Sequence, residues 1–237
     1  MNLFDIGLVL IFISFILVGF KNGVIRELAT LIGVIVLFYL SFSLKGYIGN
    51  ILCQYLPFFN FKGSIEGITT INILMYQTIA FMIVFSLLLG IYALLIKGSK
   101  IIQKLVNLTI VLIIPSKILG AIVGFIKGYI VVLVFLIVLM IPLRNESIFT
   151  GSTIINYMLY NTPIISSYTN GFTNTVTEIY DLGSKVSKKE MSTNSANLKT
   201  LDIMLKHNMV DKNTIKNLVD SGKLKGIKDI NSVLNNY

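Results

Sequence analysis

One lysine of the sequence lies where a charge is costly. Gly120, Gly124 and Gly128 recur every four residues in a long apolar segment, and Lys127 falls on the same side of that segment when it is drawn as a helix. Lys127 is ten residues beyond Lys117, or about 15 Å along a helix. At such a depth an ammonium group must be paired, hydrated or able to reach the headgroups, which makes Lys127 a candidate functional residue. The alternative is a helix that begins late and a lysine that extends to the cytoplasmic headgroups.

The same three glycines predict a packed helix face. In lipid, helices gain no hydrophobic advantage from contact, so close approach at small residues carries much of their association. We therefore expect another helix to lie against Gly120, Gly124 and Gly128. The amine of Lys127 then starts toward protein rather than toward lipid.

A second glycine-containing stretch, VGFKNGVIREL (18–28), interrupts the apolar N-terminal region and resembles VGFIKG (123–128). One alignment matches Gly-Phe-x-x-Gly; the other matches Gly-x-x-x-Gly-x-Ile-basic and pairs Arg26 with Lys127. Either alignment suggests an internal duplication. The simplest interpretation of the first copy is a cytoplasmic turn between two helices, with Glu27 near a helix start where the dipole favours an anion.

Asp5 is the acidic residue nearest the start of the sequence. It precedes Arg26 by 21 residues, about 30 Å along a helix, so the two cannot pair within one hairpin. We expect Asp5 to be an acid at the interfacial start of the first helix.

The elements that carry these residues are those of a membrane protein. Hydrophobic residues make up 54% and charged residues 13% of the chain, with a mean hydropathy of +0.81, whereas soluble domains are about 25% charged. A spanning helix needs about 20 apolar residues. Four segments qualify: 3–20, 28–44, 71–96 and 117–142. We predict an all-α polytopic membrane protein with four transmembrane helices, an interfacial amphipathic helix and a small helical C-terminal tail.

The charge distribution divides the chain into parts. The predicted parts are a transmembrane domain over 1–143, amphipathic membrane-proximal helices over 144–183, a linker over 184–197 and a three-helix module over 198–237. The interfacial helix is predicted over 101–114.

The last module is short for independent folding. About 40 residues rarely bury enough surface to be stable alone, so we expect the module to dock onto something. Asp211 and Asp229 are expected to cap its second and third helices.

The positive-inside rule gives an orientation. The first turn and the third connection hold six basic residues, against two in the second connection. The six are Lys21, Arg26, Lys97, Lys100, Lys104 and Lys117, and the two are Lys45 and Lys62. We therefore expect a multi-pass membrane protein with both termini extracytoplasmic.

Several function classes are disfavoured by what the sequence lacks. One cysteine and one histidine cannot form an internal disulfide or a Cys/His metal site, and we expect no metal or cofactor. There is no zinc-protease histidine pair, no Gly-x-Ser-x-Gly elbow and no carboxylate pair at helical spacing within a span, so we do not expect an enzyme. The basic residues form no face with stacking aromatics, so the expected partner is the lipid bilayer and not a nucleic acid.

The ordered motifs resemble the colicin V production protein (CvpA) family of bacterial membrane proteins over roughly residues 1–165. The resemblance is carried by Asp5, Gly23, Arg26, Glu27, Leu119, Gly120, Gly124, Lys127 and Gly128. The chain has Ser116 and Lys117 where the family usually has Asp-Arg, and Lys127 where Arg is frequent. Lysine is a compact charge and not a planar fork, so bidentate recognition is not expected there.

The resemblance implies a link to toxin (bacteriocin) production or export and to envelope homeostasis. The leading hypothesis is a non-enzymatic membrane factor that organises envelope or export components, with a homo-oligomer or an envelope or export protein as partner. The alternative is a small oligomeric transporter or channel in which Lys127, together with Gln77, lines an anion path.

Overall fold

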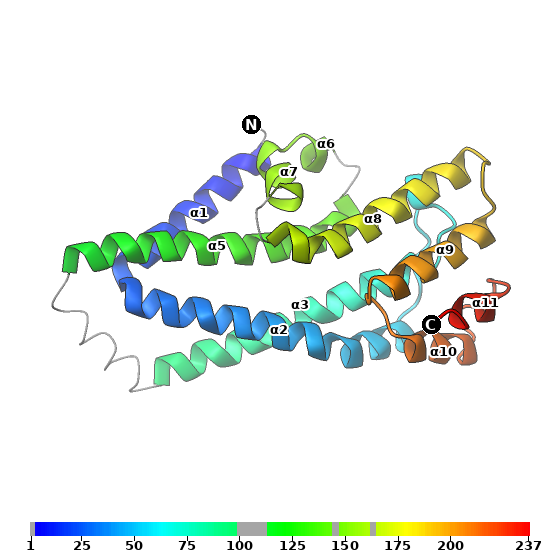
Figure 1. Ribbon diagram of the computed structural model, residues 1–237, viewed down its shortest axis with the longest axis horizontal. Coiled ribbons are helices and arrows are strands. Elements are labelled where there is room, and N and C mark those ends of the chain that lie inside the picture. The colour runs from blue at the N-terminus through cyan, green and yellow to red at the C-terminus, as the bar shows by residue number, and fades with distance from the viewer. Residues whose placement is uncertain (1–2, 99–112, 144–146, 162–164) are drawn as a thin grey trace. The chain divides into compact units, whose positions relative to one another are not determined.

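The computed structural model describes residues 3–98, 113–143, 147–161 and 165–237, and these are mostly helical with no β-strand among them. Four helices are long and apolar enough to cross a membrane (Figure 1): α1 (Leu3–Asn22), α2 (Val24–Tyr55), α3 (Ile71–Gly98) and α5 (Ile113–Leu143). The predicted all-α polytopic class is therefore confirmed. The interfacial helix predicted over 101–114 lies almost entirely outside the described residues, and its last two residues belong to α5.

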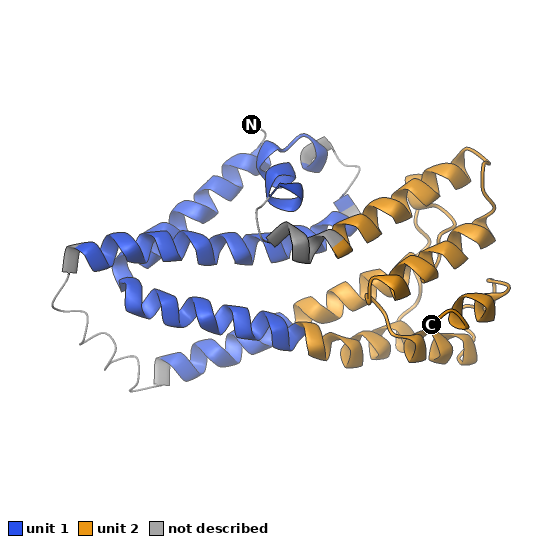
Figure 2. Ribbon diagram, in the orientation of Figure 1, with its two compact units in different colours: residues 1–41, 85–162 blue, residues 42–84, 163–237 orange. Residues whose placement is uncertain are grey.

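The described chain divides into two compact units (Figure 2). Unit 1 comprises residues 1–41 and 85–162, and unit 2 comprises residues 42–84 and 163–237. The helices α2 and α3 each contribute one half to each unit. The parts expected from the sequence were drawn from its charge distribution, whereas the two units follow tertiary contacts. In the structure the tail does not form a unit of its own but belongs to the same unit as residues 42–84.

Three spans follow the apolar segments closely, whereas α2 runs well past the predicted end at residue 44. The helix continues from Lys45 to Tyr55 through several polar residues. Hydropathy identifies the part of a helix that can lie in lipid, but the helix itself continues until its backbone hydrogen bonds end. The extra turns are held by packing within unit 2, where Gly49 lies against Gln77 of α3.

Gly23 joins α1 to α2 with a single residue. Its φ of 76° is a left-handed conformation that favours glycine. The amide of Gly23 donates to the Gly19 carbonyl at 3.0 Å, and the amide of Glu27 donates to the Gly23 carbonyl at 3.1 Å. The backbone therefore reverses at Gly23 with its helical hydrogen bonds kept on both sides.

Two short helices of unit 1 follow α5: α6 (Ser147–Thr150) and α7 (Thr153–Tyr160). Ser152 is the N-cap of α7, and its hydroxyl accepts from the Ile155 amide at 3.1 Å. The buried face of α7 consists of Ile155, Met158 and Leu159, and α7 contacts both α1 and α5. Part of the stretch that we expected on the membrane surface thus packs against the spanning helices.

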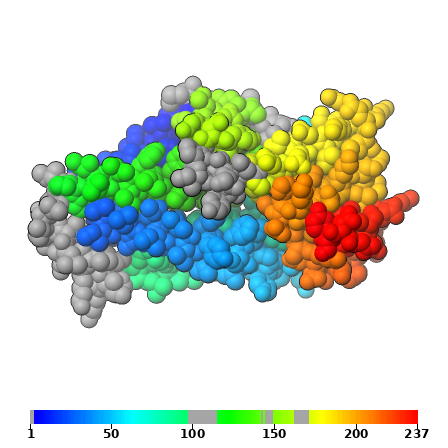
Figure 3. Space-filling model, viewed as in Figure 1, coloured from blue at the N-terminus to red at the C-terminus, as the bar shows by residue number. Residues whose placement is uncertain are grey.

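Unit 2 contains the short 3-10 helix η1 (Gly63–Ile65) and four further helices. These are α8 (Ile165–Ser187), α9 (Thr193–Lys206), α10 (Lys212–Asp220) and α11 (Ile230–Leu234). In the space-filling view α11 lies against α9 (Figure 3). Helix α8 packs on η1, where a side chain at Gly183 would overlap the backbone of Ser64.

The linker expected over 184–197 is corrected by the structure. α8 extends to Ser187 and α9 begins at Thr193, capped by Ser192. The Ser/Thr/Asn-rich composition suggested a flexible segment, but the same residue types are the ones that cap helices. The connection between α8 and α9 is therefore a short turn.

The tail docks onto the connection between α2 and α3, as its small size led us to expect. The Asn197 side chain accepts from the Thr70 amide and donates to the Gly67 carbonyl, each at 2.9 Å. Asp211 caps α10 by accepting from the Thr214 amide at 2.8 Å. Asp229 was wrongly expected to cap α11: it occupies the N-cap position with φ of 63° but makes no side-chain cap bond.

Candidate functional site

A buried carboxylate in the first turn of α2 is the centre of the site. The Glu27 side chain is 0% exposed. The Nδ2 group of Asn22, at the end of α1, donates to Glu27 Oε1 at 2.7 Å. The Gly23 turn brings these two side chains together, because it folds the last turn of α1 back on the first turn of α2.

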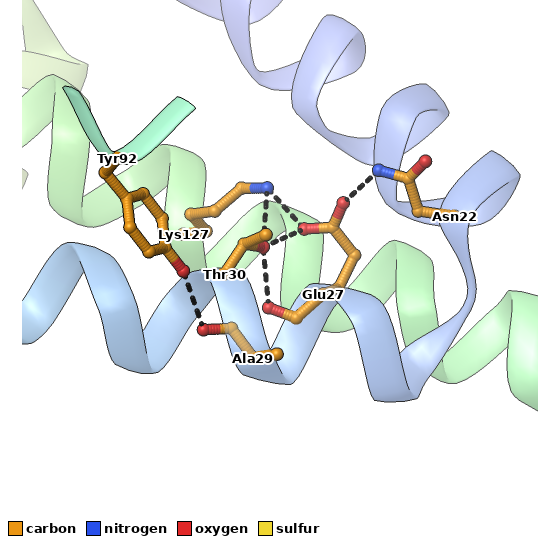
Figure 4. Close-up of polar contacts among 6 residues, drawn as sticks. All are labelled: Asn22, Glu27, Ala29, Thr30, Tyr92 and Lys127. Atoms are coloured by element: carbon orange, nitrogen blue, oxygen red, sulfur yellow. Dashed lines mark hydrogen bonds and ion pairs between the residues drawn. The ribbon is translucent and has the colours of Figure 1, made fainter. Parts of the chain in front are cut away.

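Lys127 of α5 supplies the positive charge (Figure 4). Its Nζ forms an ion pair with Glu27 Oε2, and its side chain is 12% exposed. Thr30, one turn beyond Glu27, places its Oγ1 3.3 Å from the same Nζ and donates to the Glu27 carbonyl at 2.9 Å. Because a hydroxyl has one hydrogen, Thr30 donates to the backbone and accepts from Lys127. The ammonium group therefore has two oxygen partners.

Tyr92 of α3 closes one side of the cluster. Its hydroxyl donates to the Ala29 carbonyl at 3.2 Å. The ring lies directly over Gly33, where an added Cβ would lie 2.8 Å from the ring Cε1. A glycine at position 33 is thus what lets α3 approach α2 at this level.

The glycines of α5 lie against α1. A Cβ added at Gly120 would lie 2.9 Å from the Gly23 Cα, and one at Gly124 would lie 3.0 Å from the Gly19 Cα. Any side chain there would overlap backbone, which cannot move aside cheaply. The two glycine stretches related by sequence therefore face each other across one helix interface.

Farther along, larger side chains fill the same interface. Phe15 lies against Gly128, where an added Cβ would be 2.8 Å from the Phe15 Cβ. Phe12 of α1 packs on Phe125 and Tyr129 of α5, with ring centroids 5.5 Å and 6.1 Å apart. Aromatic side chains therefore fill this part of the contact between α1 and α5.

Asp5 lies at the far end of α1 from the ion pair. As expected of an acid at a helix start, Asp5 lies in the first turn of α1; the structure adds that Asp5 is 0% exposed and that Ser152 Oγ donates to its Oδ1. Ser152 is also the N-cap of α7, so the carboxylate lies beside the N-terminus of a helix, where the dipole stabilises a negative charge. No sequence pattern links the two residues, which are 147 positions apart.

The structure thus brings together most of the residues singled out in the sequence. Glu27 and Lys127 pair, and Gly23, Gly120 and Gly124 form the helix contact beside them. Arg26 is partly exposed and is not a partner of Glu27 in the described part of the chain. Gln77 belongs to unit 2, where its Nε2 donates to Asn50 Oδ1 at 3.3 Å.

The sequence analysis did not identify two residues that contribute to the site, Thr30 and Ser116. Thr30 lies three residues after Glu27, a spacing that places both on one helix face and could have identified it. Ser116 of α5 accepts from the Val24 amide at 3.3 Å, so a neighbouring helix provides a cap for the start of α2. Only the tertiary structure reveals that cap, because the residues are 92 positions apart.

The cluster offers charge neutralisation and no obvious reactive group. Among the described residues, no buried side-chain nitrogen or oxygen lacks a hydrogen-bond partner, and no group of three or more His, Cys, Asp or Glu side chains is placed to hold a metal ion. A paired and fully hydrogen-bonded charge is the arrangement that a low-dielectric interior tolerates.

Comparison with known proteins identifies a family. No curated protein and no solved structure matches the chain. The family model described as colicin V production protein matches residues 4–163, which include the Asp5–Ser152 contact, the glycine interface and the Glu27–Lys127 pair. The chain therefore belongs to the colicin V production protein family.

Proposed function

We propose that this protein is a non-enzymatic factor of the bacterial cytoplasmic membrane that supports toxin production or export and envelope homeostasis. In this proposal the Glu27–Lys127 pair is a structural bond between α2 and α5 and not a transport site. The observation that carries the proposal is the pairing itself: Lys127, on the glycine-lined side of α5, is neutralised by a fully buried carboxylate. The partner would be a second copy or an envelope or export protein.

An anion path through Lys127 is less well supported. A lysine that attracts anions needs a free positive charge, whereas Lys127 is paired with Glu27 and also contacts Thr30. The interface beyond it is filled by Phe15 and by the Phe12, Phe125 and Tyr129 rings. Gln77, the other residue of that hypothesis, is engaged by Asn50.

Removing one charge and then both distinguishes the two functions. Lys127→Met leaves a buried carboxylate unpaired, which should cost about 3–5 kcal/mol of stability, whereas replacing both charges of a buried pair is often neutral. We expect Lys127→Met to lower the amount of folded protein in the membrane and Glu27→Gln/Lys127→Met to restore it. Asn22 can still donate to the amide oxygen of a glutamine.

The readout is complementation of a strain that lacks the gene, measured as toxin export and envelope integrity at matched protein level. A structural bond predicts that the double variant complements. A transport site predicts a double variant that is folded, present and inactive, and that result would overturn the proposal. Lys117→Met, at the cytoplasmic end of α5 where Lys117 contacts the Phe20 ring, is the matched control.

A further inference from the structure

Unlike Lys127, Lys45 of α2 has no anionic partner among the described residues. Lys45 lies 21 residues after Val24 in α2, about 31 Å along the helix. The hydrocarbon layer is about 30 Å thick. A helix that enters the bilayer near Val24 therefore leaves it near Lys45, at the membrane face toward which the α2–α3 connection projects.

Lys45 lies on the packed face of α2. Lys45, Gly49 and Cys53 recur every four residues, and Cys53 is fully buried while Gly49 lies against Gln77. The backbone of Lys45 is thus turned toward protein, and the side chain is partly buried.

The ammonium group of Lys45 points back along the helix. Its Nζ lies 4.2 Å from the centroid of the Phe42 ring, almost one turn earlier in α2. Helical side chains lean toward the N-terminus, which for Lys45 is the direction of the hydrocarbon and not of water. The ammonium group therefore lies beside the Phe42 ring, just inside the level at which α2 leaves the hydrocarbon.

Lys45 differs from Lys127 in its partners. The ammonium group of Lys127 interacts with a carboxylate and a hydroxyl. Within the described ranges Lys45 forms no ion pair and no hydrogen bond, and its ammonium group makes a cation–π contact with the Phe42 ring. A cation–π contact contributes about 0.5–2 kcal/mol, less than the several kcal/mol that a charge costs inside a membrane. The site lacks an anion.

We propose that Lys45 binds the phosphate of an anionic phospholipid whose acyl chain lies along Phe42. Headgroup phosphates lie just beyond the level at which α2 leaves the hydrocarbon, where the long, flexible side chain of Lys45 reaches them by extending toward the interface. Phe42 is 44% exposed beside Lys45, so one ligand with a charged head and an apolar chain contacts both residues. Tyr47, 75% exposed two residues later, has the amphipathic character of residues at the headgroup level. A soluble anion satisfies only the charge.

Native mass spectrometry of the full chain in detergent tests this site with phosphatidylglycerol and phosphatidylcholine as probes. We expect wild-type protein to retain phosphatidylglycerol preferentially and Lys45→Gln to bind it at least about fivefold more weakly, which corresponds to ~1 kcal/mol for one lysine at a membrane surface. Lys62→Gln, in the exposed connection between α2 and α3, is the matched control and should behave as wild type. Lys45→Arg keeps the charge and should retain the preference.

Three outcomes would overturn the proposal. The first is an unchanged phosphatidylglycerol preference in Lys45→Gln. The second is displacement of the lipid by millimolar glycerol phosphate, which would assign the site to a soluble phosphate. The third is an equal loss in Lys45→Gln and Lys62→Gln, which would indicate non-specific surface charge. If Lys45→Gln does not fold, Phe42→Leu weakens the same site without removing a charge. The proposal then requires Phe42→Leu to lose the preference for phosphatidylglycerol.

Discussion

At the scale of single residues, the described charges of the spanning helices fall into distinct environments. Glu27 and Lys127 neutralise each other, Asp5 receives a hydrogen bond from a helix cap, and Lys45 has an aromatic ring but no anion. A charge inside a bilayer persists only when its surroundings offset the loss of hydration. The different surroundings therefore predict different responses to substitution.

Ser152→Ala tests the Asp5 environment. The change removes the N-cap of α7, worth about 1 kcal/mol, and a donor to a buried carboxylate, worth about 1–3 kcal/mol. We expect it to lower the midpoint of thermal unfolding of the full chain in detergent. Ser192→Ala is a matched control, because Ser192 caps α9 at an exposed position and contacts no carboxylate. Equal effects of the two substitutions would show that the Asp5 contact adds nothing to the cap.

At the scale of elements, the interface between α1 and α5 depends on backbone proximity. Gly19 of α1 and Gly23, the residue that joins α1 to α2, meet Gly120 and Gly124 of α5, with no side chain between them. The spacing of the glycines predicted a helix against this face, and the structure places α1 there. What holds the helices is close packing, since lipid offers no hydrophobic gain for their association.

Gly124→Ala tests that interface. A Cβ at position 124 would lie 3.0 Å from the Gly19 Cα and still closer to the Phe15 carbonyl group, so we expect a loss of about 1–3 kcal/mol from overpacking. The measurement is the detergent-unfolding midpoint of the purified chain. Gly90→Ala on α3, where an added Cβ meets nothing within 4 Å, should be neutral or slightly stabilising because alanine favours helix. A Gly124→Ala variant as stable as Gly90→Ala would contradict the packing argument.

At the scale of the whole molecule, the number of spans and the contacts of the tail both place the tail on the same side of the membrane as the α2–α3 connection. Two spans, α3 and α5, separate the α2–α3 connection from the tail, so the two must lie on the same side of the membrane. Within unit 2 they do touch: Asn197 binds Thr70, and Lys223 donates to the Leu56 carbonyl at 2.9 Å. An even number of crossings between them is what permits these contacts.

The proposed orientation, with both termini extracytoplasmic, predicts labelling of the tail from outside. In a Cys53→Ala background, Asn213→Cys places a thiol on the exposed face of α10, and we expect a membrane-impermeant maleimide to modify it on intact cells. Lys21→Cys, in the basic turn, should be modified only after permeabilisation. The reverse pattern would invert the topology and leave the fold unchanged.

The sequence by itself determined the spans, the helical tail and the face of α5 that packs, because each follows from a local pattern: an apolar run, a capped amphipathic turn, a four-residue repeat. Only the tertiary structure decided which residues meet. Glu27 and Lys127 are 100 positions apart, and Asp5 and Ser152 are 147 apart. Periodicity fixes the side of a helix on which a residue lies, but its neighbour is chosen by how the helices pack. For the same reason the length of α2 and the docking of the tail were decided by contacts within unit 2 and not by hydropathy.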